Sequence, residues 1–125
     1  RTYIQKFLYL ITREFFDNKL FSYVNYKYGP FSDELNTMVT ELEFQDIINE
    51  SAELTKGLKT GYIYELTPKG KKIAEEIFNK KLPIKLRSEL IEYTNKFRGF
   101  TPTDLLKYVY SKYPEVAENS IYKED

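Results

Sequence analysis

Short stretches of helical periodicity are the feature of this sequence that most restricts its fold. Apolar residues recur three and four positions apart in five separate segments, the spacing that places side chains on one face of a helix. The expected helices cover residues 3–16, 32–44, 68–80, 84–98 and 102–112. No apolar run is long enough to span a membrane. The pattern predicts a single, mainly helical domain.

Capping signals set the boundaries of these helices. Ser32 and Thr67 are expected N-caps, and Pro68 takes the first helical position after Thr67. Thr101-Pro102 repeats that start, with Asp104 placed as the third residue of a capping box. Asp17-Asn18 ends the first helix, and the tail over residues 115–125 is expected to fray.

The apolar stripes of these helices define the expected core. They comprise Ile4, Phe7, Leu8, Ile11 and Phe15, then Leu35, Met38, Val39 and Leu42, then Ile73, Ala74, Ile77 and Phe78, then Leu86, Leu90, Tyr93 and Phe97, and finally Leu105, Leu106, Val109 and Tyr110. Gly29 is expected to supply a backbone angle or a close approach that a side chain would block. Gly70 is expected to let its helix pack closely on neighbouring strands.

Two regions between the helices have the character of extended chain. Residues 21–28 are rich in aromatic and β-branched side chains and are expected to form a short strand, which Gly29-Pro30 interrupts. Ile47-Ile48 begins a second strand and residues 62–66 form a third. A polar, lysine-bearing tip separates those two, so they predict a β-hairpin.

Composition excludes several kinds of chemistry. The 125 residues contain no Cys, His or Trp, which removes disulfides, zinc fingers and all Ser-His or Cys-His catalysis. No phosphate-binding loop or metal-ligand motif is present, so we expect no enzyme activity, no cofactor and no metal. Glu41, Glu43 and Asp46 are the best magnesium candidates, although a solvent-facing helix surface explains them more simply. A cytoplasmic location is the default expectation.

The order helix, helix, hairpin, helix resembles a winged helix-turn-helix with two additional C-terminal helices. Residues 62–74 resemble the Y-x-L-T-x-x-G-x-x-x-A stretch that follows the wing in PadR-like regulators, and Leu42-Glu43 with Ile47-Ile48 resembles the stretch before it, with Asp46 where glycine is usual. Residues 26–35 are similar to the Y-x-Y-G-P-F-S-x-x-L motif of predicted archaeal and bacterial transcriptional regulators that are largely uncharacterised. The resemblance implies a mainly α protein with a small β-hairpin wing.

This architecture predicts a winged-helix domain over residues 1–82 and a helical extension over residues 83–125 packed on it. The Lys-, Glu- and Ile-rich, Gln- and Met-poor composition also resembles that of proteins from heat-loving microbes. The first residue is Arg1 rather than Met, so the native start is expected to be missing or processed.

The formal net charge of zero conceals strongly charged blocks. Residues 31–53 carry seven acidic residues and no basic one, whereas residues 54–87 carry nine basic and three acidic ones. Phosphates would repel the helix at 32–44, the usual recognition helix, and it offers no Arg or Lys to read guanine. Standard docking of that helix in the major groove is therefore disfavoured.

Two functional hypotheses remain. In the first, a transcriptional regulator contacts double-stranded DNA through the wing and the helix after it, using the lysines Lys56, Lys59, Lys69, Lys71 and Lys72; a solvated lysine-rich surface is the simpler alternative. In the second, the scaffold binds another protein, with an acidic face meeting a basic partner or a second copy. The residues for this role are Asp33, Glu34, Glu41, Tyr23, Tyr26 and Tyr108, although ordinary core and rim packing also explains the tyrosines. A homodimer is expected through apolar surface of the C-terminal helices.

Overall fold

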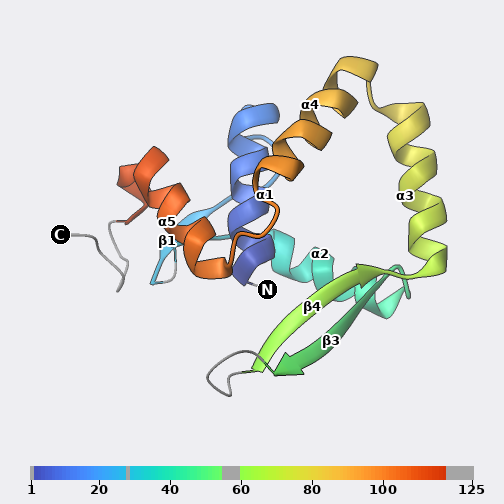
Figure 1. The fold of residues 1–125 in the computed structure, drawn as a ribbon, viewed down its shortest axis with the longest axis horizontal. Helices are drawn as coiled ribbons and strands as arrows, with labels where there is room; N and C mark the ends of the chain where they lie inside the picture. The colour runs from blue at the N-terminus through green and yellow to red at the C-terminus, as the bar shows by residue number, and fades with distance from the viewer. Residues whose placement is uncertain (1, 28, 55–59, 118–125) are drawn as a thin grey trace. The chain divides into compact units, whose positions relative to one another are not determined.

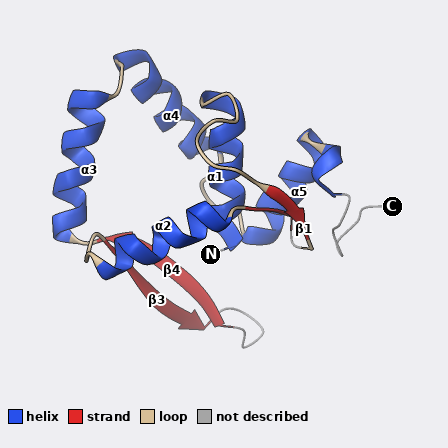
Figure 2. Cartoon of the chain, turned by 180° about the vertical axis from the view of Figure 1, so that it is seen from behind, coloured by secondary structure: helices blue, strands red, loops and turns tan. Residues whose placement is uncertain are grey.

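The protein is mainly α-helical, with two small antiparallel hairpins (Figures 1 and 2). The structure, a computed structural model, describes residues 2–27, 29–54 and 60–117. In these ranges the elements are α1 (Thr2–Phe15), β1 (Val24–Tyr26), β2 (Gly29–Phe31), α2 (Asp33–Phe44), β3 (Ile48–Leu54), β4 (Thr60–Leu66), α3 (Pro68–Lys81), α4 (Ile84–Lys96), α5 (Pro102–Lys112) and the 3₁₀ turn η1 (Pro114–Ala117). All five expected helices are present, which confirms the mainly α class.

The chain divides into two compact units. The first, the core unit, combines residues 1–37 with residues 97–125, and the second, the hairpin unit, is residues 38–96. Each unit is described here by itself. The boundary near Pro83 that the sequence suggested stays a prediction.

The core unit holds most of the buried apolar side chains. On α5, the four expected inward residues Leu105, Leu106, Val109 and Tyr110 are all buried. Phe97, which follows the end of α4, is almost fully buried and packs edge-on against Phe7 and Tyr108, with ring centroids 6.0 and 4.9 Å away. The capping box at Thr101 and Asp104 forms as predicted, with each side chain accepting from the other residue's backbone N–H. Local sequence signals thus predicted α5 in detail.

The buried face of α1 is not the one that periodicity predicted. Ile11 is buried, but the rest of the expected stripe is only half-buried, and Gln5 and Lys6 are almost fully buried instead. Gln5 is satisfied because its amide donates to the Ser32 carbonyl at 3.0 Å and accepts from the Ser32 N–H at 2.8 Å. A polar side chain whose donor and acceptor both bond to backbone groups can be buried at little cost in free energy.

Lys6 is the most unusual residue of this face. Its ammonium donates to the Pro30 carbonyl at 3.2 Å, and only 2% of the residue is exposed. The carbonyl carries no full charge, so it offsets only part of the cost of taking an ammonium out of water. Burial accordingly lowers the pKa of Lys6 to about 8.

Gly29 and Pro30 form part of a strand rather than the interruption that the sequence suggested. β1 and β2 pair antiparallel, with Asn25 opposite Pro30 and Tyr26 opposite Gly29. Gly29 has φ +94°, and a Cβ there would lie 2.6 Å from Leu106 Cδ1 on α5. Both expected reasons for a glycine, the backbone angle and the close approach, are therefore confirmed at this position.

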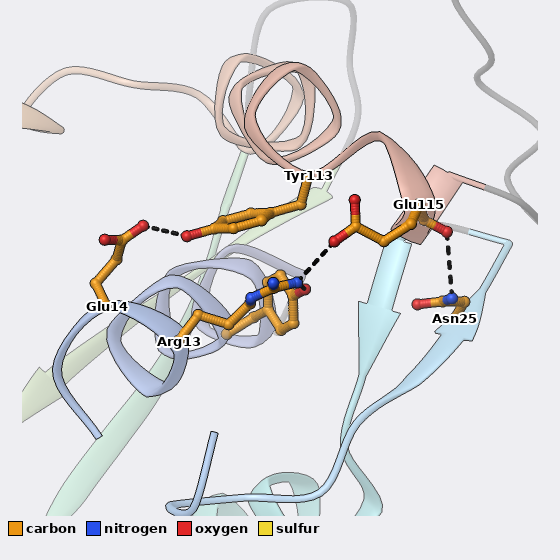
Figure 3. Close-up of polar contacts among 6 residues, drawn as sticks. Arg13, Glu14, Asn25, Tyr113 and Glu115 are labelled. Carbon is orange, nitrogen blue, oxygen red and sulfur yellow. Dashed lines mark hydrogen bonds and ion pairs between the residues drawn. The ribbon is translucent and has the colours of Figure 1, made fainter. Parts of the chain in front are cut away.

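The end of α1 is tied to the end of α5 by charged and aromatic side chains (Figure 3). Arg13 lies over the Tyr113 ring, 3.9 Å from its centroid, and its guanidinium donates to Glu115 at 2.9 Å. Glu14 accepts from the Tyr113 hydroxyl and pairs with Lys112 at 2.6 Å. Burial raises the pKa of Glu14, but the bonds from Lys112 and Tyr113 outweigh it and hold the pKa below its usual range.

These contacts order a segment that the sequence did not mark as structured. Pro114–Ala117 forms η1, and Val116 in it is buried, so the expectation of a frayed tail is wrong for its first residues. Residues 118–125 of that tail lie outside the described residues.

Candidate nucleic-acid interface

The site begins where α2 ends. Asp46 has φ +61°, and its N–H donates to the Glu43 carbonyl while the Ile47 N–H donates to the Leu42 carbonyl. This pair of bonds is the Schellman arrangement, in which the residue with positive φ is usually glycine. Asp is one of the few other residues that tolerate this conformation. Asp46 thus ends the helix as the glycine of the related motif would.

Thr67 joins this turn to the start of α3. Its hydroxyl donates to the Asp46 carbonyl at 2.6 Å and accepts from the Gly70 N–H at 3.0 Å, and its own N–H donates to the Ile47 carbonyl at 3.0 Å. Pro68 occupies the first turn, where its missing N–H leaves no bond unmade. The predicted N-cap is confirmed, and it fixes the first turn of α3 against the entry to β3.

Gly70 makes that close approach achievable. A Cβ at this position would lie 2.0 Å from the Ile47 carbonyl oxygen, a backbone atom that cannot move aside. The predicted role of Gly70 in close packing is therefore confirmed. The consequence is a rigidly anchored helix N-terminus beside the hairpin base.

Three of the five predicted DNA-contacting lysines lie in this first turn. Lys69, Lys71 and Lys72 are all exposed, and α3 has no acidic residue in its first turn. The Lys69 ammonium donates to the Gln45 carbonyl at 2.9 Å and so also caps the end of α2. Lys72 projects from the side of the helix opposite Gly70, and Lys71 is exposed about 100° around the helix axis from that glycine. Lys56 and Lys59 lie outside the described residues.

The charge in this turn opposes the stability of the helix. The N-terminal end of a helix carries a partial positive charge, which favours acidic side chains and disfavours lysines. Three lysines there raise the local positive potential beyond that of the helix itself. This arrangement suits a bound anion held by the lysine side chains, because Pro68 has no N–H and the Gly70 and Lys71 N–H groups already donate to Thr67.

Helix α2, whose first turn belongs to the core unit, and the β3–β4 hairpin have the opposite charge. α2 has Asp33 and Glu34 in its first turn and no basic residue anywhere along it. The strands β3 and β4 include Glu50 and Glu65 and no basic residue either. On the described strands, Glu50 accepts from the Tyr64 hydroxyl. α4 also begins with basic residues, Lys85 and Arg87, and has no acidic residue in its first turn, but Arg87 is half-buried and donates to the Leu82 carbonyl at 3.0 Å. Among the described elements of this unit, the start of α3 therefore has the larger group of exposed lysines.

The residues proposed for protein binding differ in their surroundings. Asp33, Glu34 and Glu41 are exposed on α2, and Glu34 accepts from the Ser22 N–H at 3.0 Å. Tyr26 is exposed beside Phe31, with ring centroids 6.0 Å apart.

Tyr23 and Tyr108 are packed into the core unit rather than freely exposed. The Tyr23 ring meets Tyr9 edge-on at 5.1 Å, and burial raises the pKa of Tyr23 to about 12. Tyr108 is half-buried against Phe97 and Phe100. Their roles as surface anchors are weakened, because much of each ring already contacts the chain itself.

Sequence periodicity missed the most exposed aromatic residue of the hairpin unit. Phe44, at the end of α2, is 92% exposed, and Met38 on the same helix is also exposed although it was assigned to the inward stripe. Phe44 falls two positions after Leu42, which places it off the apolar stripe of the helix. That offset was a readable signal of exposure.

Other kinds of site find no support in the described parts of the chain. Glu41, Glu43 and Asp46 do not gather into a group of three or more acidic side chains that could hold a metal ion, and residues 2–27, 29–54 and 60–117 contain no such group. Among the described helices, none is long and apolar enough to cross a membrane.

Comparisons with known proteins add no relative. No protein-family model matches the chain, and no curated protein matches it. The resemblance to winged-helix regulators therefore rests on the motifs given above.

Proposed function

We propose that this protein is a winged-helix DNA-binding protein that contacts the phosphates of duplex DNA through the first turn of α3 and the tip of the β3–β4 hairpin. The order α1, α2, β3–β4, α3 is compatible with a winged helix, with β3–β4 as the wing. The observation that carries the proposal is the exposed group Lys69, Lys71 and Lys72 on a rigidly anchored helix N-terminus.

The helix that normally reads bases has a different role in this proposal. α2 is acidic along its length, so entering the major groove would set its carboxylates against the phosphates. Binding through α3 and the wing needs no such contact. It yields backbone recognition with little sequence preference, because phosphate contacts position a protein without reading bases.

The test is a salt series of fluorescence anisotropy with labelled random-sequence duplex DNA. Wild type should bind at low salt, and the logarithm of the binding constant should fall linearly with the logarithm of the salt concentration. Lys71→Gln and Lys72→Gln should each reduce the steepness of that line by about 0.9. Lys107→Gln, the same charge change on α5 in the core unit, is the matched control and should leave the line unchanged.

The two lysines of the wing need a separate test. Lys56→Glu with Lys59→Glu tests the wing tip, and together they should abolish binding at moderate salt. Failure of wild type to bind duplex DNA at low salt would overturn the proposal. Loss of binding on Asp33→Ala and Glu34→Ala, with no effect of the lysine variants, would overturn the docking through α3.

Phe44 favours a second candidate function, binding of a basic protein. A fully exposed aromatic ring beside acidic Glu41 and Glu43 is the combination expected where an apolar anchor is surrounded by charge. A labelled polylysine peptide serves as the probe. Binding that Glu41→Lys removes and Phe44→Ser weakens, with Lys107→Gln inert, would support this function; no binding to wild type would exclude the electrostatic part of it.

A further inference from the structure

Helix α4 has an apolar side that nothing in the described chain buries. Ile84 is 75% exposed and Ile91 is 52% exposed, and α4 contains no buried residue. The two isoleucines are seven positions apart, which is two turns, so they lie on the same side of the helix. Its half-buried apolar residues Leu86, Leu90 and Tyr93 occupy the other side.

A helix of this length needs a tertiary contact. Isolated helices shorter than about 12–15 residues are marginal in water, and α4 has 13 residues. Two exposed isoleucines give it no stability unless another surface covers them. The covering surface must be apolar along one line and must also match the charges on either side of that line.

The charges of α4 indicate what that surface is. Lys85 and Arg87 lie in the first half of the helix, Glu89 and Glu92 follow them, and Lys96 lies in the last turn. Lys96 agrees with the helix dipole, which favours acidic residues first and basic residues last, whereas the order of the other four charges runs against it. The arrangement is self-complementary, however, because an antiparallel copy of the same helix places its acidic half beside the basic half.

We propose that α4 is an interaction surface for a second copy of this chain, in which two α4 helices pack antiparallel about a two-fold axis near Ser88. Ile84 of one chain then meets Ile91 of the other, and Lys85 meets Glu92. Both pairs follow from the same register, since each joins residues placed nearly symmetrically about Ser88. The serine is small enough to let the helices approach closely.

The structure leaves these groups available for the contact. Lys85 is 3.9 Å from Glu89 in its own helix, and the Lys85 side chain is almost completely exposed. A single helix pair buries less area than a standard interface, so the dimer is concentration-dependent.

The experiment is analytical ultracentrifugation of the full chain over a concentration series, without DNA. Wild type should show a monomer–dimer equilibrium. Lys85→Glu and Glu92→Lys should each raise the dissociation constant about tenfold or more, because each places like charges together twice. The double variant should return to the wild-type constant, and an equal mixture of the two single variants should form heterodimers in preference to homodimers.

The variants separate dimerisation from folding. Lys85→Glu and Glu92→Lys both improve the fit of α4 charges to its own dipole, so helix content measured by circular dichroism should not fall. Lys107→Glu on α5 is the control for net charge and should dimerise as wild type does. A chain that stays monomeric at every concentration overturns the proposal, as does a dimer that neither single variant weakens or that the double variant does not restore.

Discussion

The two units of this chain distribute their apolar side chains in opposite ways. Among the described residues, ten of the eleven buried apolar side chains belong to the core unit, and Val39 is the exception. Eight of the eleven exposed large apolar residues belong to the hairpin unit, including Phe44, Ile84 and Ile91. The core unit therefore supplies its own packing, whereas the hairpin unit presents apolar and charged groups that suit contacts with other molecules.

The difference between the two units predicts that the largest loss of stability follows a substitution at a fully buried position of α5. Leu105→Ala should lower the free energy of unfolding by about 3 kcal/mol, because Leu105 has no exposed surface and its loss leaves a cavity. Leu66→Ala, the matched change at an exposed position of β4, should cost well under half as much. Urea denaturation measures both. Equal losses would show that the two units do not differ in packing.

Gly70→Ala tests a tight contact between α3 and the turn after α2 in the hairpin unit. The new Cβ would meet the Ile47 carbonyl oxygen at 2.0 Å, so the start of α3 must shift. We expect a loss of about 2 kcal/mol in unfolding free energy and weaker DNA binding. Gly99→Ala is the control for space, since a Cβ there meets nothing within 4 Å, although its φ of +87° adds backbone strain. A stable Gly70→Ala variant would mean that α3 is not anchored at Ile47.

The lowered pKa of Lys6 predicts that the core unit becomes more stable as the pH rises into the alkaline range. The pKa of Lys6 is about 8 in the folded state and near its ordinary value of 10.5 in the unfolded state. Between these values the unfolded state binds more protons, so the free energy of unfolding increases as pH rises from 8 towards 10. The penalty of the buried ammonium is fully present below pH 8.

Substitution of Lys6 checks this assignment. Lys6→Met should raise the free energy of unfolding by about 2 kcal/mol at pH 7 and should abolish the rise between pH 8 and 10. Lys107→Met, at an exposed position of α5, should do neither. Thermal unfolding across this pH range gives both quantities. A rise that persists in Lys6→Met would assign it to another group.

The smallest expected effect is at Asp46. Asp46→Gly removes a side chain from a residue with φ +61° and a negative charge from the C-terminal end of α2, and should stabilise the chain by about 0.5–1 kcal/mol. Asp46→Ala leaves the residue at positive φ, a conformation that alanine tolerates less well than aspartate does. This substitution should destabilise the chain by about 1 kcal/mol. Denaturant midpoints of the two variants should therefore move in opposite directions.

Local signals explain which parts of the fold were readable in the sequence. The N-cap bonds of Thr67 and Thr101 to the start of their own helices span only three residues, and both caps were predicted correctly. The glycines at 29 and 70 were also predicted correctly from their residue type, although the groups they approach, Leu106 and Ile47, are distant in sequence. The buried face of α1 was not, because Gln5 and Lys6 owe their burial to carbonyls of Ser32 and Pro30, more than twenty residues away. Periodicity of apolar residues carries no trace of such bonds.

Part of the candidate site could also be predicted from local sequence signals, and part of it could not. Lysines at 69, 71 and 72 are visible as a cluster at a helix start, and their exposure follows from the periodicity of α3. The second role of Lys69 at the Gln45 carbonyl depends on how α2 ends, which required the positive φ of Asp46. The exposure of Phe44 could be read from its offset from the apolar stripe of α2, whereas the exposure of Ile84 depends on what the rest of the chain covers, which no local pattern determines.

The central claim is that nucleic acid binds the hairpin unit at α3 and leaves the core unit untouched. Hydrogen-exchange mass spectrometry with and without duplex DNA at low salt tests it most directly. With DNA bound, backbone amides in peptides covering the first turn of α3 should exchange more slowly, and amides of α1 and α5 should exchange at the same rate as without DNA. Protection of α2 or α5 with none at α3 would contradict it.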